Sequence, residues 1–237
     1  MSKEQRADGE PWDIPGLRLQ YDVAPGHWLL TQFRPADQCD VGAWTPKSFD
    51  AYVRIAYPFR ELTSGRLIRW SELAQRSGEA VGPSTAAREL LSRERASIDG
   101  QKIFALAQLP DEELRILTSL LRTHSETPDS TWLCIWEGYG DLGLQPDPRP
   151  KEPPRLRFPD RDRQYVLYRG GADAPLLVRE GHNYMGDIWW PDDRAWVLTT
   201  DTDFDWVYLA GSTDVIEDLV SAPGLEVFVT GPDDPAG

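Results

Sequence analysis

The stretch Gly186–Gly211, which reads GDIWWPDDRAWVLTTDTDFDWVYLAG, decides the fold of this chain. Two segments within it, Trp196–Thr200 and Asp205–Ala210, are rich in β-branched and aromatic residues and flank a polar turn, which predicts two neighbouring strands. The stretch also holds six aspartates and one arginine. We therefore expect the core strand pair of a C-terminal β-sheet, with tryptophans packed beneath it and an acidic rim above.

Strand signals continue on both sides of that stretch. Short runs of alternating or β-favouring residues, bounded by turn-forming residues, predict further strands. These runs are Leu17–Val23, Trp28–Phe33, Phe49–Ala56, Trp132–Glu137, Gln164–Tyr168, Pro175–Arg179 and Leu225–Thr230. The pair Gly170-Gly171 predicts a hairpin that joins Gln164–Tyr168 to Pro175–Arg179.

Four segments have the composition and the end signals of helices: Trp70–Gly78, Ser84–Ser97, Asp111–Arg122 and Thr213–Val220. Ser71 and Ser212 are candidate N-caps for the first and the last of them, and Gly78 is a typical C-terminal stop. Helices and strands are partly segregated along the chain rather than strictly alternating. We therefore predict an α+β fold, with mostly antiparallel twisted sheets and several flanking helices.

The length of 237 residues favours one domain. We expect a flexible N-terminal tail at residues 1–16, a single α+β domain at residues 17–230 and a flexible tail at residues 231–237. Residues 141–163 contain six prolines and many charges, which is typical of a linker or a long loop. A division into two parts near residue 150 is the alternative.

The chain is strongly acidic, with 25 Lys and Arg against 39 Asp and Glu and a formal charge of −14. Such a charge repels nucleic acid and anionic membranes on average, so we expect neither as a partner. A solubilising surface explains this charge, and a basic protein partner is the more specific reading.

The two cysteines, Cys39 and Cys134, lie far apart in the sequence, and Cys134 sits in an apolar run. A buried free thiol in a reducing compartment is the expected state of such a residue. The N-terminal residues are polar and charged, and no apolar run approaches the roughly 20 residues that span a bilayer. We therefore expect a cytoplasmic protein.

Asp201, Asp203 and Asp205 form the first candidate site. On a strand, residues two apart share one face, and three carboxylates on one face need a positive partner. A hard cation such as Ca²⁺ or Mg²⁺ would supply it, although the spacing does not match an EF-hand loop. The alternatives are turn-capping or solvent-facing aspartates over a tryptophan core that includes Trp190 and Trp196, or a Trp-lined cage for a cationic ligand.

Arg54 and Glu137 extend this candidate site. Arg54 alternates with apolar neighbours, so on a strand it faces away from them and, if covered, must pair with an acid such as the Asp201–Asp205 face. The other possibility is an exposed edge arginine. Glu137 lies between aromatic residues at a strand end, where it suits either a general acid or base or a turn cap. Neither a catalytic residue nor a cofactor is predicted, and the metal stays unknown.

Arg155–Arg163 is a basic run that interleaves with aromatic residues, a pattern that single-stranded nucleic acid can use. Two aspartates inside the run and the overall negative charge oppose that reading. Signatures of catalytic histidine pairs, Cys-x-x-Cys sites, nucleophile elbows and phosphate-binding loops are absent from the sequence.

Four blocks together resemble an uncharacterised family of actinobacterial hypothetical proteins that carry a WWPxDRAW block. The blocks are Phe49–Ile55, Trp136–Gly140, Tyr165–Gly170 and Trp189–Trp196, in the same order as in that family. The resemblance implies a single-domain cytoplasmic protein and carries no catalytic residue across. Members commonly have His where this chain has Tyr57, so any proton transfer that depends on such a His would be missing here.

These observations predict a soluble cytoplasmic protein, most readily a non-enzymatic acidic protein-interaction module of the adaptor or immunity-like kind. The alternative is a metal- or small-ligand-binding protein, or an enzyme, that uses an acidic Trp-rich site. Its candidate ligand-binding residues are Asp201, Asp203, Asp205, Arg54, Glu137, Trp190 and Trp196. The oligomeric state is open.

Overall fold

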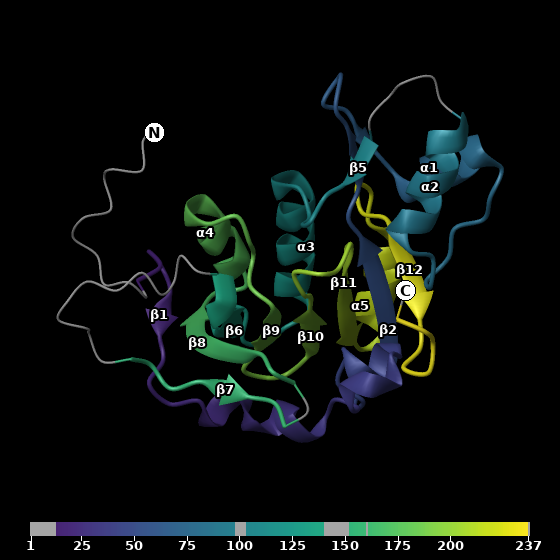
Figure 1. Cartoon of the computed structure of the whole chain (residues 1–237). Coiled ribbons are helices and arrows are strands. Elements are labelled where there is room, and N and C mark those ends of the chain that lie inside the picture. The colour runs from purple at the N-terminus through teal and green to yellow at the C-terminus, as the bar shows by residue number, and fades with distance from the viewer. Residues whose placement is uncertain (1–12, 98–102, 140–151, 160, 237) are drawn as a thin grey trace.

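The computed structural model describes residues 13–97, 103–139, 152–159 and 161–236. It confirms the predicted α+β class, with twisted antiparallel sheets and flanking helices (Figure 1). Because strands from before and after residue 150 pair in the same sheet, a domain boundary at that point would cut through it.

The main sheet has nine strands, and every pairing in it is antiparallel. Across the sheet they run β1 (Arg18–Leu19), β8 (Gln164–Gly170), β6 (Thr131–Trp136), β9 (Ile188–Pro191), β10 (Trp196–Thr199), β11 (Trp206–Gly211), β2 (Ala51–Ala56) and β12 (Val227–Thr230), with β7 (Leu156–Arg157) beside β8. The predicted C-terminal strand pair, β10 and β11, is central in this order.

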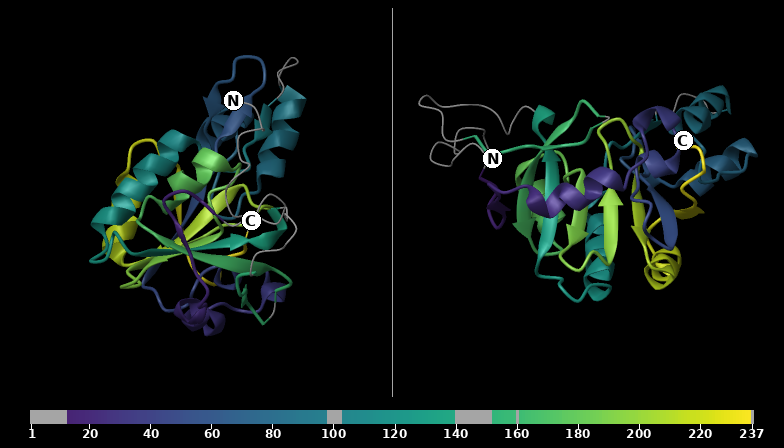
Figure 2. Two further views of the ribbon diagram at one scale, coloured as in Figure 1. Left: turned by 90° about the vertical axis from the view of Figure 1, so that its left-hand side faces the viewer. Right: turned by 90° about the horizontal axis from the view of Figure 1, so that it is seen from below.

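Two layers cover the main sheet on opposite faces (Figure 2). One face carries α3 (Asp111–Thr123), α4 (Ala174–Gly181) and α5 (Thr213–Ser221), packed on the largest hydrophobic cluster. The other carries the N-terminal 3₁₀ segments η1 (Ala24–Thr31), η2 (Ala36–Gln38) and η3 (Val41–Ala43). Trp189 and Trp190, neighbours in β9, point to opposite faces and enter different clusters, as the period of two in a strand requires, and Trp196 of β10 lies on the same face as Trp189.

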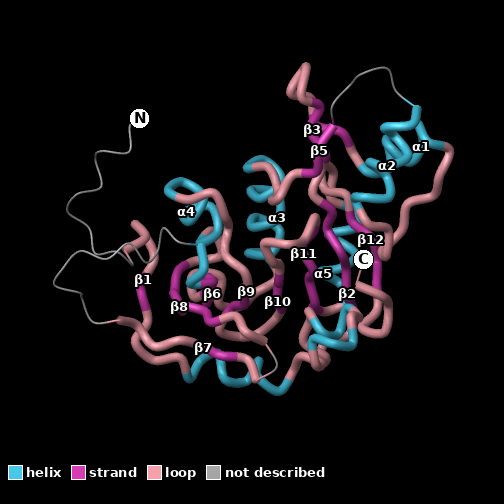
Figure 3. The backbone as a smooth tube through the Cα atoms, viewed as in Figure 1, coloured by secondary structure: helices cyan, strands magenta, loops and turns pink. Residues whose placement is uncertain are grey.

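A smaller unit projects from the β2 end of the main sheet (Figure 3). It consists of a three-stranded sheet with the order β4 (Leu67–Ile68), β3 (Phe59–Glu61) and β5 (Ile103–Ala105), together with α1 (Trp70–Ser77) and α2 (Ala87–Ser97). Its own cluster of buried residues includes Trp70 and Phe59, and Phe228 of β12 packs against that cluster. The projecting unit is therefore joined to the main sheet by apolar contacts.

Two predicted strands are helical. Trp28–Phe33 falls largely in η1, where Pro25 starts a 3₁₀ helix and Leu29 is buried against the sheet. Pro175–Arg179 lies in α4, where Pro175 occupies the first turn, a position that favours proline because no intrahelical N–H is lost. The Gly170-Gly171 pair therefore leads into a helix and not into a hairpin strand.

Described residues within both expected tails pack against the rest of the structure. Ile14, inside the expected N-terminal tail, is only 1% exposed and belongs to the main core. Near the C-terminus, the N–H of Val41 donates to the carbonyl of Asp234 at 2.9 Å, and the N–H of Ala236 donates to Cys39 at 3.0 Å. Residues 231–236 therefore pack against η3 through backbone hydrogen bonds.

The predicted N-cap of α5 is confirmed, and that of α1 is wrong. The Ser212 hydroxyl accepts from the N–H of Val215. In α1 the N-cap position is Arg69, and the carboxylate of Glu226 accepts from the N–H groups of Trp70 and Ser71 instead. Among the described residues, none of the helices combines the length and the apolarity that crossing a membrane requires.

Candidate ligand pocket

The three predicted aspartates lie in the loop between β10 and β11 and do not share a strand face. Asp201 is 5% exposed, whereas the side chain of Asp203 is 81% exposed. The carboxylate of Asp201 accepts from the N–H of Asp203 at 3.0 Å, which closes a tight turn. The three aspartates therefore belong to a turn, and not to the extended strand that their spacing of two residues suggested.

Arg163 is the positive partner of this loop. Its guanidinium lies 2.7 Å from Asp201 Oδ1 and 2.9 Å from Asp203 Oδ2, and it stacks over the ring of Trp136 at 4.3 Å. An arginine of the basic run therefore supplies the neutralising charge. Within the described parts of the chain, no three His, Cys, Asp or Glu side chains come together in a way that could hold a metal ion.

Arg54 is fully buried, on the opposite side of β2 from Val53 and Ile55, as its alternation predicted. Its guanidinium stacks over Trp206 at 3.9 Å and Trp70 at 4.9 Å, and it donates to the carbonyls of Pro83 and Thr85. Burial lowers the pKa of Arg54 to about 10. Asp205 contributes its negative charge to this site, whereas Asp201 and Asp203 pair with Arg163.

The remaining predicted residues have structural contacts. Glu137 forms an ion pair with Arg155 at 2.7 Å. Trp190 packs edge-on against Trp28 in the cluster under η1, and the Trp196 N–H donates to the carbonyl of Leu121 at 3.0 Å. Of the seven predicted residues, Asp201 alone lines the pocket that the described part of the chain forms.

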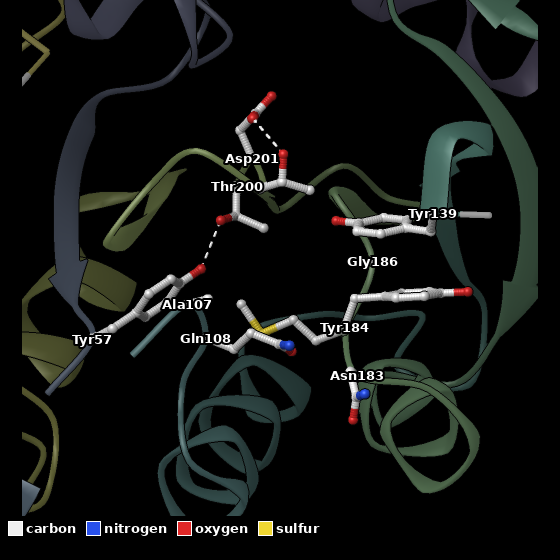
Figure 4. A pocket seen from close by; sticks show the side chains of 11 residues that line it. Tyr57, Ala107, Gln108, Tyr139, Asn183, Tyr184, Gly186, Thr200 and Asp201 are labelled. Carbon is white, nitrogen blue, oxygen red and sulfur yellow. Dashed lines mark hydrogen bonds between the residues drawn. The ribbon is translucent and has the colours of Figure 1, made fainter. Parts of the chain in front are cut away.

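That pocket has a volume of about 150 Å³ and lies at one end of the main sheet (Figure 4). It is bounded by the residues that follow β2 and β10, by those that precede β9 and α3, and by the short helix η4 (Glu137–Tyr139). The lining residues are Tyr57, Ala107, Gln108, Tyr139, Asn183, Tyr184, Met185, Gly186, Thr200, Asp201 and Thr202.

One wall of the pocket is a stack of rings. Tyr139 lies parallel to Tyr184, with centroids 3.9 Å apart and planes 11° apart, and the His182 ring stacks on Tyr184 with centroids 4.9 Å apart. Gly186 adopts a φ of +88°, and a Cβ there would meet Leu133 Cδ1 at 2.4 Å. A glycine is therefore required where the chain turns from the stack into β9.

The opposite wall carries a short hydrogen-bond chain. The Thr200 hydroxyl donates to the carbonyl of Trp206 at 3.0 Å, which uses its only proton. In the 2.6 Å contact between Tyr57 Oη and Thr200 Oγ1, Tyr57 is therefore the donor. Burial raises the pKa of Tyr57, so the phenol keeps this proton at neutral pH.

A buried carboxyl group lies at the hydroxyl end of Tyr139. Asp187 is 1% exposed and accepts from the backbone N–H of Trp136 at 2.7 Å and from the hydroxyl of Tyr139 at 2.9 Å. Burial raises its pKa to about 7, against the opposing effect of these hydrogen bonds. Burial also raises the pKa of Asp201. Asp187 can exchange a proton near neutral pH, and Tyr139, which lines the pocket, donates its hydroxyl proton to it.

Sequence reasoning missed Tyr57, Tyr184 and Asp187 as site residues and treated Tyr139 only as part of a turn. The signals were present but weak: an aspartate directly before a buried strand, and tyrosines at the ends of predicted strands. No family model matches the chain, and searches of curated proteins and of solved structures gave no match. The resemblance to an actinobacterial family therefore stays a prediction.

Proposed function

We propose that this chain is a ligand-binding protein and that the tyrosine-walled pocket holds a small organic molecule. The observation that carries this proposal is the Tyr139–Tyr184 stack, with the hydroxyl of Tyr139 hydrogen-bonded to the buried carboxyl group of Asp187. Ligand sites combine an apolar, often aromatic, wall with a few convergent polar groups. Holding a carboxyl group in such a place costs desolvation energy, which a purely structural core avoids.

The size and composition of the pocket support a small ligand. A space of about 150 Å³ is smaller than the roughly 300–1,000 Å³ of drug-sized ligand sites, so it suits only a small organic molecule. Met185 and the tyrosine rings offer apolar contact area, whereas Thr200, Gln108 and Asn183 offer hydrogen-bonding groups. These groups come from separate segments that the main sheet holds in place, so the pocket is formed before a ligand arrives.

Methionine-methyl NMR tests the proposal. The chain has two methionines, Met1 and Met185, and Met185 lines the pocket. In protein labelled with [¹³C-methyl]methionine, a small-fragment library should contain members that shift the Met185 signal and leave the Met1 signal in place. Gly186→Ala, whose added methyl group enters Leu133, serves as a variant with a distorted pocket. A library in which no member moves the Met185 methyl would contradict the proposal.

The predicted interaction module is a second candidate function. The formal charge of −14 favours it, because a negative surface speeds encounter with a basic protein, as an adaptor or immunity-like role requires. Isothermal titration with a basic protein such as lysozyme, at 20 mM and 300 mM salt, separates specific from non-specific attraction. A stoichiometric complex that survives the higher salt would support this role, and heats that vanish there would count against it.

A further inference from the structure

The pocket presents hydrogen-bond acceptors. The hydroxyl protons of Tyr57, Thr200 and Tyr139 are all committed inside the protein, to Thr200, to the Trp206 carbonyl and to Asp187 respectively. Each hydroxyl oxygen still has a lone pair, because it can accept as well as donate. A ligand that meets this part of the pocket must therefore bring its own N–H or O–H donors.

The net charge around the pocket is negative. Four carboxyl groups lie in or next to its wall, Asp187, Asp201, Asp203 and Asp111, against the two guanidinium groups of Arg163 and Arg179. Arg163 pairs with Asp201 and Asp203, and Arg179 lies 3.1 Å from Asp111 and donates to Gln108. Four against two leaves a net charge of −2 when every group is ionised, which disfavours an anionic ligand.

Tyr139 connects these two properties. Figure 4 shows its hydroxyl directed toward the middle of the pocket, while Tyr184 directs its hydroxyl the other way. A donor that binds to Tyr139 Oη strengthens the hydrogen bond that Tyr139 already gives to Asp187, because hydrogen bonds in a chain polarise one another. A positively charged donor gains most from this chain, since it ends on a carboxylate.

We propose that the ligand of this pocket is an organic ammonium ion, whose N–H groups donate to the hydroxyl oxygens of the wall and whose hydrocarbon part packs on Met185 and the tyrosine rings. This inference rests on the proposed ligand-binding function. The side-chain oxygen of Gln108 accepts a hydrogen bond from Arg179, so the NH₂ group of Gln108 can donate to an acceptor on the same ligand.

The test uses three probes of the same shape and different charge: benzylammonium, benzyl alcohol and benzoate. Each is titrated into the [¹³C-methyl]methionine-labelled protein at pH 7.5 while the Met185 methyl signal is followed. We expect benzylammonium to bind with a Kd about tenfold below that of benzyl alcohol, which corresponds to about 1.4 kcal/mol. Benzoate should leave the Met185 signal unmoved.

Tyr139→Phe is the matched variant, because it keeps the ring stack and removes the acceptor oxygen. It should weaken benzylammonium binding about fivefold to tenfold and leave benzyl alcohol binding within a factor of two. Tyr52→Phe, which removes a buried hydroxyl that donates to the carbonyl of Pro46 at 3.1 Å outside the pocket lining, is the control and should change neither.

The outcomes separate the two proposals. If benzyl alcohol or benzoate binds as tightly as benzylammonium, or if Tyr139→Phe has no selective effect, the ammonium assignment is wrong and the ligand-binding function stands. If neither these probes nor the fragment library moves the Met185 signal, both proposals fail.

Discussion

The hydroxyl of Tyr139 lies 2.9 Å from Oδ1 of Asp187 and donates its proton to that buried carboxyl group. Hydrogen bonds to a carboxylate stabilise its charged form and so lower its pKa. Tyr139→Phe should therefore raise the pKa of Asp187 above its value of about 7. Carboxyl ¹³C NMR of the labelled protein across pH 5–9 measures this shift. Tyr184→Phe should leave the pKa unchanged, and an equal shift in both variants would refute the proposed coupling.

Asp187 should also make stability depend on pH. Its folded pKa of about 7 lies above the ordinary value of 3.8 for an exposed aspartate, so the folded state binds more protons than the unfolded state between about pH 4 and pH 7. The free energy of unfolding should therefore fall as pH rises through this window, by up to about 1.4 kcal/mol per pH unit, and level off above it. Asp187→Asn should flatten this slope in urea denaturation series.

Glu113 titrates in the same window and must be separated from Asp187. It is 3% exposed, and burial raises its pKa to about 7 although Arg69 lies 2.9 Å away. Glu113→Gln should thus remove its own part of the slope, and the double variant should remove both parts. A slope that persists in full in the double variant would show that other groups cause it.

The environment of Arg54 predicts that lysine cannot replace it. The planar guanidinium stacks on Trp206 and reaches the carbonyls of Pro83 and Thr85 together, whereas an ammonium group is compact and has no flat face. Arg54→Lys should lower the free energy of unfolding by about 2 kcal/mol and increase amide exchange in the loop that contains Pro83. Arg18→Lys, on the exposed side of β1, is the control and should be neutral within about 0.5 kcal/mol.

Local sequence patterns correctly predicted the segments in which the spacing of apolar side chains matches the repeat of a strand or a helix. Trp196–Thr200 alternates between two buried faces, and Asp111–Arg122 repeats leucines at helical spacing, so both formed as predicted. Trp28–Phe33 is apolar without a usable period, so only tertiary packing could decide that it forms part of a 3₁₀ segment. Pro175 is compatible both with a segment that follows a turn and with the start of a helix. The sequence was interpreted as a strand after a turn, whereas the structure has the helix α4.

The candidate site was harder to predict for a different reason. Several acids close together are visible in the sequence, and this cluster led to the prediction of Asp201 as a site residue. Asp201 does line the pocket. Tyr57, Tyr139 and Tyr184 come from three segments that are brought together only by the order of strands β2, β6 and β9 in the sheet. No local pattern carries that order. Arg54 was correctly placed on the side of β2 away from its neighbours, but its aromatic partners belong to distant segments.

A side chain at Gly186 should cause a steric clash, whereas a side chain at Gly78 should not. In Gly186→Ala the new methyl group meets Leu133 and lies 2.9 Å from Trp189 Nε1, in addition to the unfavourable positive φ. We expect a loss of more than about 2 kcal/mol in the free energy of unfolding. Gly78→Ala also has a positive φ but meets nothing within 4 Å, so about 1 kcal/mol should be lost. Equal losses in urea denaturation would mean that space at Gly186 is not limiting.

The N-terminus of α1 offers a direct choice between the cap that the sequence suggests and the one that the structure contains. Glu226, just before β12, accepts from the N–H of Trp70 at 2.6 Å and from that of Ser71 at 2.7 Å, and its charge also favours the positive end of the helix. Glu226→Gln should therefore lower the free energy of unfolding by about 1 kcal/mol, with a larger loss for Glu226→Ala. Ser71→Ala should change it by less than about 0.5 kcal/mol, because Ser71 lies inside the helix and Arg69 occupies the cap position. Urea denaturation at pH 7.5 compares the three variants. A loss in Ser71→Ala as large as that in Glu226→Gln would show that Ser71 caps the helix.

Because Glu226 also connects the projecting helical unit to the edge of the main sheet, Glu226→Gln should raise amide exchange in α1 more than in α3.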